Sequence, residues 1–166
     1  MTSDRNQELR DATFEEGGEA PLHLMAVDAE DLAVIAALVQ DAIFPAGEMK
    51  WLAGQRRFAI LLNRFRWEDQ PAAERQNRPY ERVQALMIFD DVQKVSSQGI
   101  ARNDKELVLS LLDISFEAGE DGSGRLILTL AGDGAIALEV ESLNVTLKDV
   151  TKPYVAPSRK APHHPE

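Results

Sequence analysis

The chain has 166 residues, 44% of them hydrophobic, which suits one domain with its own core. It has no cysteine, and this excludes a disulfide framework, a thiolate metal site and a thiol nucleophile. Its net charge of −10 disfavours nucleic acid and anionic membrane as partners, because both attract basic surfaces. The sequence has no signal peptide and no apolar run of ~18 residues, so we expect a cytoplasmic protein.

The first predicted elements are a leader, a strand and a helix. Residues 1–20 are polar and acidic and predict a disordered leader, whereas the apolar run at residues 22–27 indicates a strand. Asp28 suits the N-cap of a helix, whose apolar stripe extends at helical spacing to Ile43. We expect Pro45 to end this helix.

The middle of the chain changes to a period of two. Residues 49–53 and 57–67 alternate as strands do, and residues 82–90 do so again. Residues 68–80 are polar, contain two prolines and predict a loop. Residues 106–116 are mostly apolar and fit either a helix or a strand, with a strand favoured in the second half.

The strongest strand pattern lies near the carboxyl terminus. Residues 126–130, 136–140 and 143–147 each carry a large aliphatic side chain at every second position. The sequence Gly-Asp-Gly at 132–134 predicts a tight hairpin connection between the first two. Residues 152–166 contain four prolines and predict an extended tail.

These elements predict an α+β fold with a mainly antiparallel sheet of about seven strands. We expect the sheet to be curled or two-layered, with one amphipathic helix near the amino terminus packed on it. The predicted domain spans residues 21–151, between the leader at 1–20 and the tail at 152–166.

Residues 54–82 form a cationic island, with seven arginines against four acidic residues in an acidic protein. Strand alternation places Arg64 and Arg66 on one face, ~6.6 Å apart along the strand, a spacing that suits a bidentate clamp on a carboxylate or phosphate. The candidate anion-binding residues are therefore Arg57, Asn63, Arg64 and Arg66. The alternative, which the acidic composition favours, is that Arg64 and Arg66 pair with acids on adjacent strands.

No catalytic or metal-binding motif stands out. The chain lacks HExxH, a phosphate-binding Walker loop and GxGxxG, so we expect neither a metal nor a cofactor. Its histidines are His23 in the first strand and the adjacent His163 and His164 in the tail. An enzyme in which Asp41 or Asp90 acts as a base beside the arginines stays an alternative.

Three sequence runs carry a family resemblance: RRFAILLNRFRWE at 56–68, LLDISFE at 111–117 and LEVESLNVTLKDV at 138–150. With these runs the chain resembles an uncharacterised alphaproteobacterial family, domain of unknown function 2948, over roughly residues 21–164. The resemblance implies a bacterial cytoplasmic protein. It transfers no catalytic residue, because none is established for that family.

The sequence thus favours a non-catalytic binding or protein-interaction module. The first alternative is an enzyme or ligand-binding protein that takes a small anionic metabolite on the Arg64 and Arg66 face. The second alternative is a structural homodimer, in which edge strands or stacked sheets pair. The expected partners are a second copy of the chain, another protein or a small anion.

Overall fold

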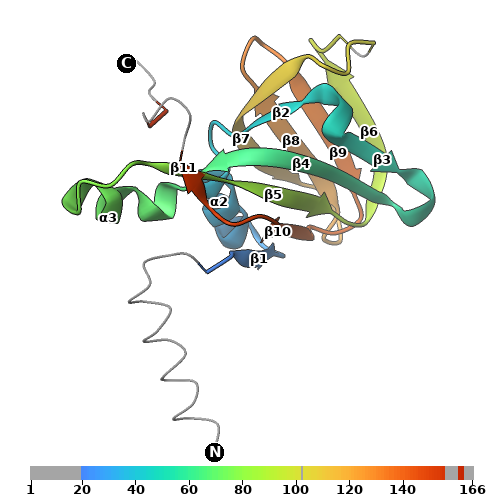
Figure 1. Cartoon of the computed structure of the whole chain (residues 1–166). Helices are drawn as coiled ribbons and strands as arrows, with labels where there is room; N and C mark the ends of the chain where they lie inside the picture. Colours follow the sequence, from blue (N-terminus) through green and yellow to red (C-terminus); the bar gives the residue numbers. More distant parts are fainter. Residues whose placement is uncertain (1–19, 102, 156–160, 163–166) are drawn as a thin grey trace, which may run out of the picture.

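A computed structural model of the chain describes residues 20–101, 103–155 and 161–162 (Figure 1). Within these residues, eleven strands form a mainly antiparallel open sheet. The strands are β1 (His23–Ala26), β2 (Ile43–Pro45), β3 (Met49–Leu52), β4 (Arg57–Phe65), β5 (Glu81–Phe89), β6 (Val92–Gln98), β7 (Val108–Ala118), β8 (Gly124–Leu130), β9 (Ala135–Val140), β10 (Val145–Asp149) and β11 (Tyr154–Val155). Most of the predicted leader and tail, namely residues 1–19, 156–160 and 163–166, lie outside the described residues.

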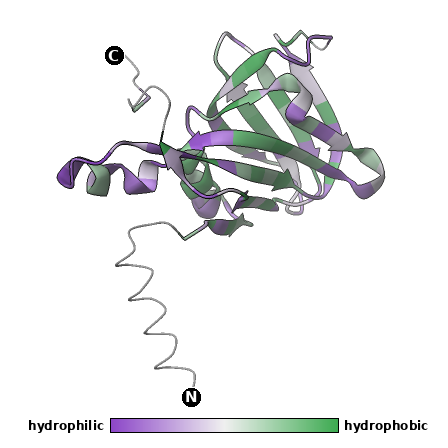
Figure 2. Ribbon diagram, in the orientation of Figure 1, coloured by the Kyte–Doolittle hydropathy of each residue, from purple (hydrophilic) through white to green (hydrophobic). Residues whose placement is uncertain are grey.

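The strands follow the order β1-β10-β5-β4-β2-β7-β8-β9-β6, with β3 added to β4 and β11 added to β5. In Figure 1, β4 and β5 cross in front of β7, β8 and β9, so the sheet curves back on itself. The inner faces of both halves contribute to one buried core. Alternate residues of β4 such as Ile60 and Leu62 meet there with Leu126 and Leu128 of β8, and Figure 2 shows these strands banded with hydrophobic residues.

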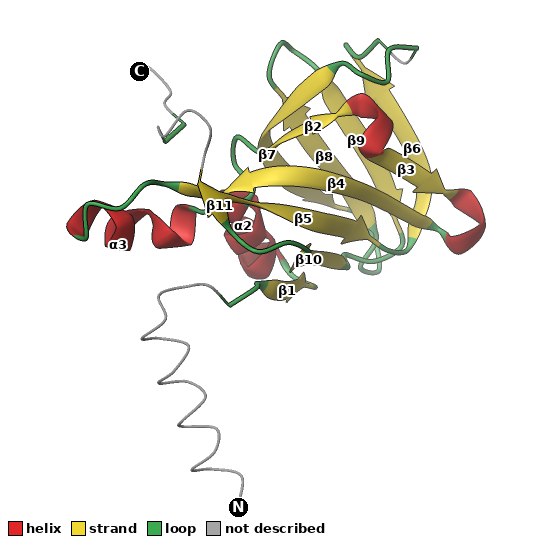
Figure 3. Ribbon diagram, in the orientation of Figure 1, coloured by secondary structure: helices red, strands yellow, loops and turns green. Residues whose placement is uncertain are grey.

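Two α-helices and three short 3-10 helices complete the described fold (Figure 3). They are α2 (Ala29–Leu38), α3 (Gln70–Arg75), η1 (Ala46–Glu48), η2 (Ala53–Gln55) and η3 (Trp67–Asp69). The N-cap prediction for α2 agrees with the structure, since Asp28 Oδ1 accepts a hydrogen bond from the Asp31 amide at 2.8 Å. The helix buries Leu32 and Ile35 and packs against β1 and β7.

The predicted helix is too long. In the structure the helix ends at Leu38. Asp41 then adopts a left-handed backbone conformation with φ of 63°, and this turns the chain back to the sheet. The Asp41 amide donates to Leu111 O at 2.7 Å, and the Leu111 amide donates to Ala42 O at 2.8 Å. The chain beyond Leu38 therefore becomes β2, because pairing with β4 and β7 outweighs the helical spacing of Ile43.

The prediction of about seven strands is also too low. Strands β2 and β11 are too short to show alternation. The strand predicted at residues 82–90 corresponds to β5, and β6 follows it as a separate strand after a turn with φ of 59° at Asp91. β11 lies within the predicted tail, where Tyr154 and Val155 pair with β5. The ambiguous segment 106–116 resolves as β7.

The predicted loop at 68–80 contains most of η3 and all of α3. Pro71, which favoured a loop, lies in the first helical turn, where a missing N–H costs nothing. Figure 3 shows α3 projecting away from the sheet. No helix in the described part of the chain is long and apolar enough to cross a membrane.

Candidate functional site

Arg64 is the last residue on the core-facing side of β4, and its side chain is fully buried. Its Nη1 and Nη2 donate to the two carboxylate oxygens of Glu68 at 2.9 and 2.8 Å. Its Nε and Nη2 donate to the two oxygens of Asp149 at 3.0 and 2.9 Å, and Nη1 also reaches the Phe65 carbonyl at 3.4 Å. These contacts use all five N–H donors of the guanidinium, so Arg64 has none left for an added anion.

Two opposing effects act on the Arg64 charge. Burial by itself lowers the pKa of the guanidinium, but hydrogen bonds to Glu68 and Asp149 outweigh it and raise the pKa above its ordinary value. Asp149 in turn accepts from the Leu22 amide at 2.9 Å, and its own amide donates to Leu22 O at 2.9 Å. Arg64 therefore ties β4 to β10 and, through Asp149, to the residue before β1.

Arg66 is also buried and belongs to the same cluster. Its Nη1 donates to Glu81, lies 3.5 Å from Asp69 Oδ2, and its Nε lies 3.7 Å from Glu68 Oε2. Arg78 makes a two-pronged contact with Asp69 at 3.1 and 3.2 Å, and this contact raises the pKa of Arg78. Every described arginine of the cluster thus faces at least one carboxylate. Of the partners, only Glu81 lies on a strand next to β4, whereas Glu68 and Asp69 lie in η3 and Asp149 lies on β10. The expected pairing with acids on adjacent strands therefore holds for Arg66, and Arg64 finds its acids elsewhere.

The other two predicted site residues lie elsewhere. Arg57 starts β4, at the end far from Arg64, where its Nε donates to Asp90 Oδ1 at 2.8 Å. Asn63 points to the opposite face of β4 from Arg64 and contacts Arg82 and Tyr154. The structure therefore brings Arg64 and Arg66 together but separates both from Arg57 and Asn63.

A cavity of about 160 Å³ opens between β3 and β6. Most of its walls are apolar: Met49 of β3, Phe58 of β4, Val95 of β6, Ile136 of β9, and Ala46 and Ile100 nearby. A cavity of about 150 Å³ with such a lining is large enough for a benzene molecule. The space therefore fits an aromatic ring or a short branched acyl chain.

Two polar residues, Ser97 and Lys105, also line this cavity. Lys105 lies on an exposed connection between β6 and β7 and is the one charged residue of the lining. Two backbone hydrogen bonds hold this connection against η1: Gly47 N to Lys105 O at 2.9 Å and Ala46 N to Leu107 O at 2.8 Å. A Cβ on Gly47 would lie 3.1 Å from Lys105 Cβ, so the glycine permits the close approach of the two segments.

Sequence reasoning did not find this cavity. Its walls come from β3, β4, β6, β9, η1 and the β6–β7 connection, which no short motif links. In the sequence, each lining residue looks like an ordinary residue of a strand or loop. Only the pairing of β6 with β9, and of β3 with β4, brings them together.

Comparison with known proteins gives a family but no activity. No curated protein and no solved structure matches the chain. The model of one family, described as a protein of unknown function (DUF2948), matches residues 22–164. This match spans nearly all of the described residues, and the chain belongs to that family.

Proposed function

We propose that this protein is a binding module for a small organic acid with an apolar body. The cavity between β3 and β6 carries the proposal, because a concave, mainly apolar space with few polar groups is the usual form of a small-ligand site. An aromatic ring or short acyl chain occupies the cavity, and the acidic group of the ligand lies at Lys105. No catalytic step is part of this proposal.

The charge of the lining supports an anionic ligand. The protein as a whole carries a net charge of −10, which repels anions at long range. The cavity lining, in contrast, contains a lysine and no carboxylate. At the exposed rim an ion pair contributes about 1 kcal/mol or less, so most of the affinity comes from burial of the apolar part.

The test is a titration followed by the methyl resonances of Val95, Ile100 and Ile136. The probes are benzoate, hexanoate and benzyl alcohol, which is close to benzoate in size but neutral. We expect saturable shifts of these methyl resonances with all three probes and tighter binding of the acids. Lys105→Gln weakens the binding of benzoate by up to about fivefold and leaves the binding of benzyl alcohol unchanged.

Lys94→Gln is the matched control, because Lys94 is an exposed lysine of β6 outside the cavity lining. It removes the same charge and is expected to leave benzoate binding unchanged. Ala46→Phe fills the cavity and should abolish binding of every probe. Methyl resonances that do not respond to any probe would refute the site, and equal loss in both lysine variants would refute the role of Lys105.

A further inference from the structure

Arg82, the last residue of the cationic island, lies on the opposite face of the sheet from the buried Arg64 side chain. Arg82 of β5 pairs in register with Phe65 of β4 on one side and with Tyr154 of β11 on the other. Residues directly opposite one another in a sheet share a face, so these three side chains form one row. Asn63, two residues before Phe65, lies on the same face.

Arg82 differs from the other arginines that are at least half-buried. Arg57, Arg64, Arg66 and Arg78 each contact a carboxylate within 4.0 Å. Arg82 has no such contact within the described residues, although the chain has 28 acidic residues. Burial lowers the pKa of Arg82, whereas Tyr154 and Asp41 act on it only at a distance and in the opposite direction. The Arg82 guanidinium is therefore partly removed from water without the close carboxylate that each of the other four arginines has.

The contacts of Arg82 fix its orientation and leave one edge open. Nη1 donates to Asn63 Oδ1 at 3.0 Å and to Asn63 O at 3.3 Å. The guanidinium carbon lies 6.0 Å from the centre of the Phe65 ring, which is itself held by Trp67 and Tyr80. No described residue accepts from Nε or Nη2, and these two groups form the edge that binds an oxyanion in two-pronged fashion.

Tyr154 supplies a further donor in the same row. Its hydroxyl oxygen accepts a hydrogen bond from Asn63 Nδ2, so its own hydrogen is directed elsewhere. No described residue accepts that hydrogen. Asn63 therefore positions both neighbours, with its amide oxygen on Arg82 and its amide nitrogen on Tyr154.

We propose that Arg82, Asn63 and Tyr154 form an oxyanion-binding site on the outer face of β4, β5 and β11. The oxyanion, a carboxylate or a phosphate, accepts from Nε and Nη2 of Arg82 and from the Tyr154 hydroxyl. Asn63 is the positioning residue. The site lies at the Phe65 end of β4, whereas the apolar cavity includes Phe58 near the other end, so the two sites are separate.

The test follows the Nε–Hε resonance of Arg82 in the full chain during titration with sodium acetate or sodium phosphate. Sodium chloride keeps the ionic strength constant, because exposed ion pairs weaken with salt. We expect a saturable shift of this resonance. The anion that binds more tightly, acetate or phosphate, identifies the oxyanion class. Tyr154→Phe weakens binding by about two- to tenfold, the value of one hydrogen bond.

Arg82→Lys keeps the charge but loses the two-pronged edge, so it should lose saturable binding, which is then read from the Tyr154 ring resonances. Arg75→Gln is the control, since Arg75 is an exposed arginine of α3 with no ion pair among the described residues. If the shift of the Arg82 resonance does not saturate with either salt, the proposal is overturned. Unchanged affinity in Arg82→Lys or in Tyr154→Phe overturns it as well, and the wild-type titration decides the matter even if Arg82→Lys fails to fold.

Discussion

At the scale of single residues, the core face of β4 ends in a charge where a hydrocarbon side chain would ordinarily pack. Arg64 follows Ile60 and Leu62 on that face and is equally buried. Removing a guanidinium from water costs several kcal/mol, and only a complete set of partners offsets that cost. Glu68 and Asp149 supply this set, so the stability of the cluster depends on all three side chains being present.

Arg64→Met should reduce the free energy of unfolding by about 3–5 kcal/mol, because it leaves Asp149 buried without its cation. Urea denaturation followed by circular dichroism measures this change. Arg125→Met is the matched control, since Arg125 pairs with Glu139 on the surface, and it should cost less than about 1 kcal/mol. Equal effects of the two substitutions would contradict the structural role of Arg64.

Adding Asp149→Asn to Arg64→Met should recover part of the lost stability, because it removes the buried carboxylate charge that the first substitution leaves unpaired. The same denaturation measurement gives the coupling between the two residues. If the double variant loses as much as the two single variants added together, Arg64 and Asp149 act independently and the description of the cluster is wrong.

At the scale of elements, the sequence predicted those strands whose alternation reflects one buried face. The strands β4, β5, β8 and β9 show this pattern, and all four are present. The alternation fails for β2, since its three residues become a strand only through partners on β4 and β7. The sequence also missed helix α3, because a proline in the first turn of a helix looks, in sequence, like a proline in a loop.

The candidate sites were predictable to a smaller extent. The arginine-rich composition of residues 54–82 pointed to the segment that holds the buried Arg64 and Arg66, and strand alternation predicted that these two side chains share a face. Composition does not give partners, however: Asp149 lies 85 residues from Arg64 in the chain. The cavity and the row around Arg82 both depend on strand order, which local patterns do not specify.

Strand β8 begins at a glycine that leaves no space for a side chain. A Cβ on Gly124 would lie 2.5 Å from both Glu117 O and Phe116 Cζ. Gly124→Ala should therefore destabilise the fold by about 1–3 kcal/mol, as overpacking does. Gly54→Ala, where no atom lies within 4 Å of the added Cβ, should change stability by less than about 1 kcal/mol. Thermal denaturation compares the two, and equal melting temperatures would contradict the close contact.

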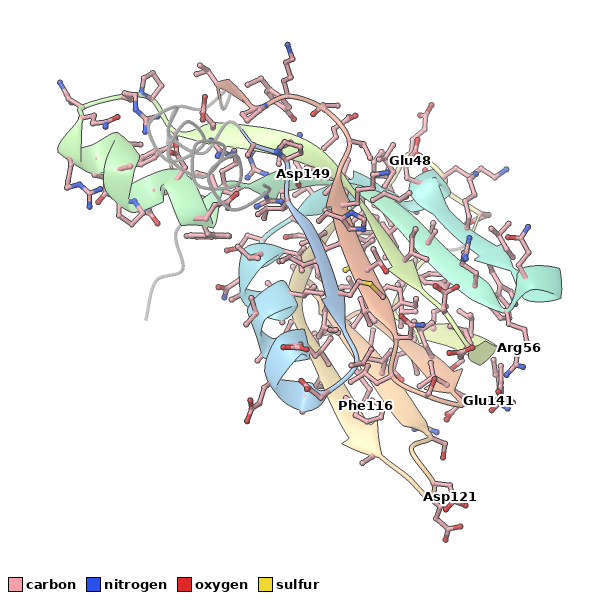
Figure 4. The ribbon with its side chains drawn as sticks, turned by 90° about the horizontal axis from the view of Figure 1, so that it is seen from below. Glu48, Arg56, Phe116, Asp121, Glu141 and Asp149 are labelled. Atoms are coloured by element: carbon pink, nitrogen blue, oxygen red, sulfur yellow. The ribbon has the colours of Figure 1, made fainter. Side chains whose placement is uncertain are left out.

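At the scale of the whole molecule, polar contacts hold the curved sheet at both ends. The arginine cluster joins β4, β5 and β10 at one end. At the other end, Arg56 pairs with Glu141 at 2.7 Å, the Val92 amide donates to Arg56 O, and the Glu141 amide donates to Asp91 O. In Figure 4, Asp149 lies toward the end from which α3 projects, and Arg56 and Glu141 lie together away from it.

The two ends of the main strand order, β1 and β6, are poor surfaces for pairing with a second copy of the chain. β1 is an edge strand of only four residues. β6, at the other edge, carries Lys94 and a shift in register beside it. Short length, an edge lysine and an irregular register all oppose pairing between sheets, and the net charge of −10 adds repulsion between copies.

We therefore expect a monomer of 18.4 kDa by size exclusion with light scattering, at low and high protein concentration and in high salt. A dimer mass that persists on dilution would instead support the homodimer alternative. A charge placed on β1, Met25→Lys, would then identify that edge as the interface if it restored the monomer.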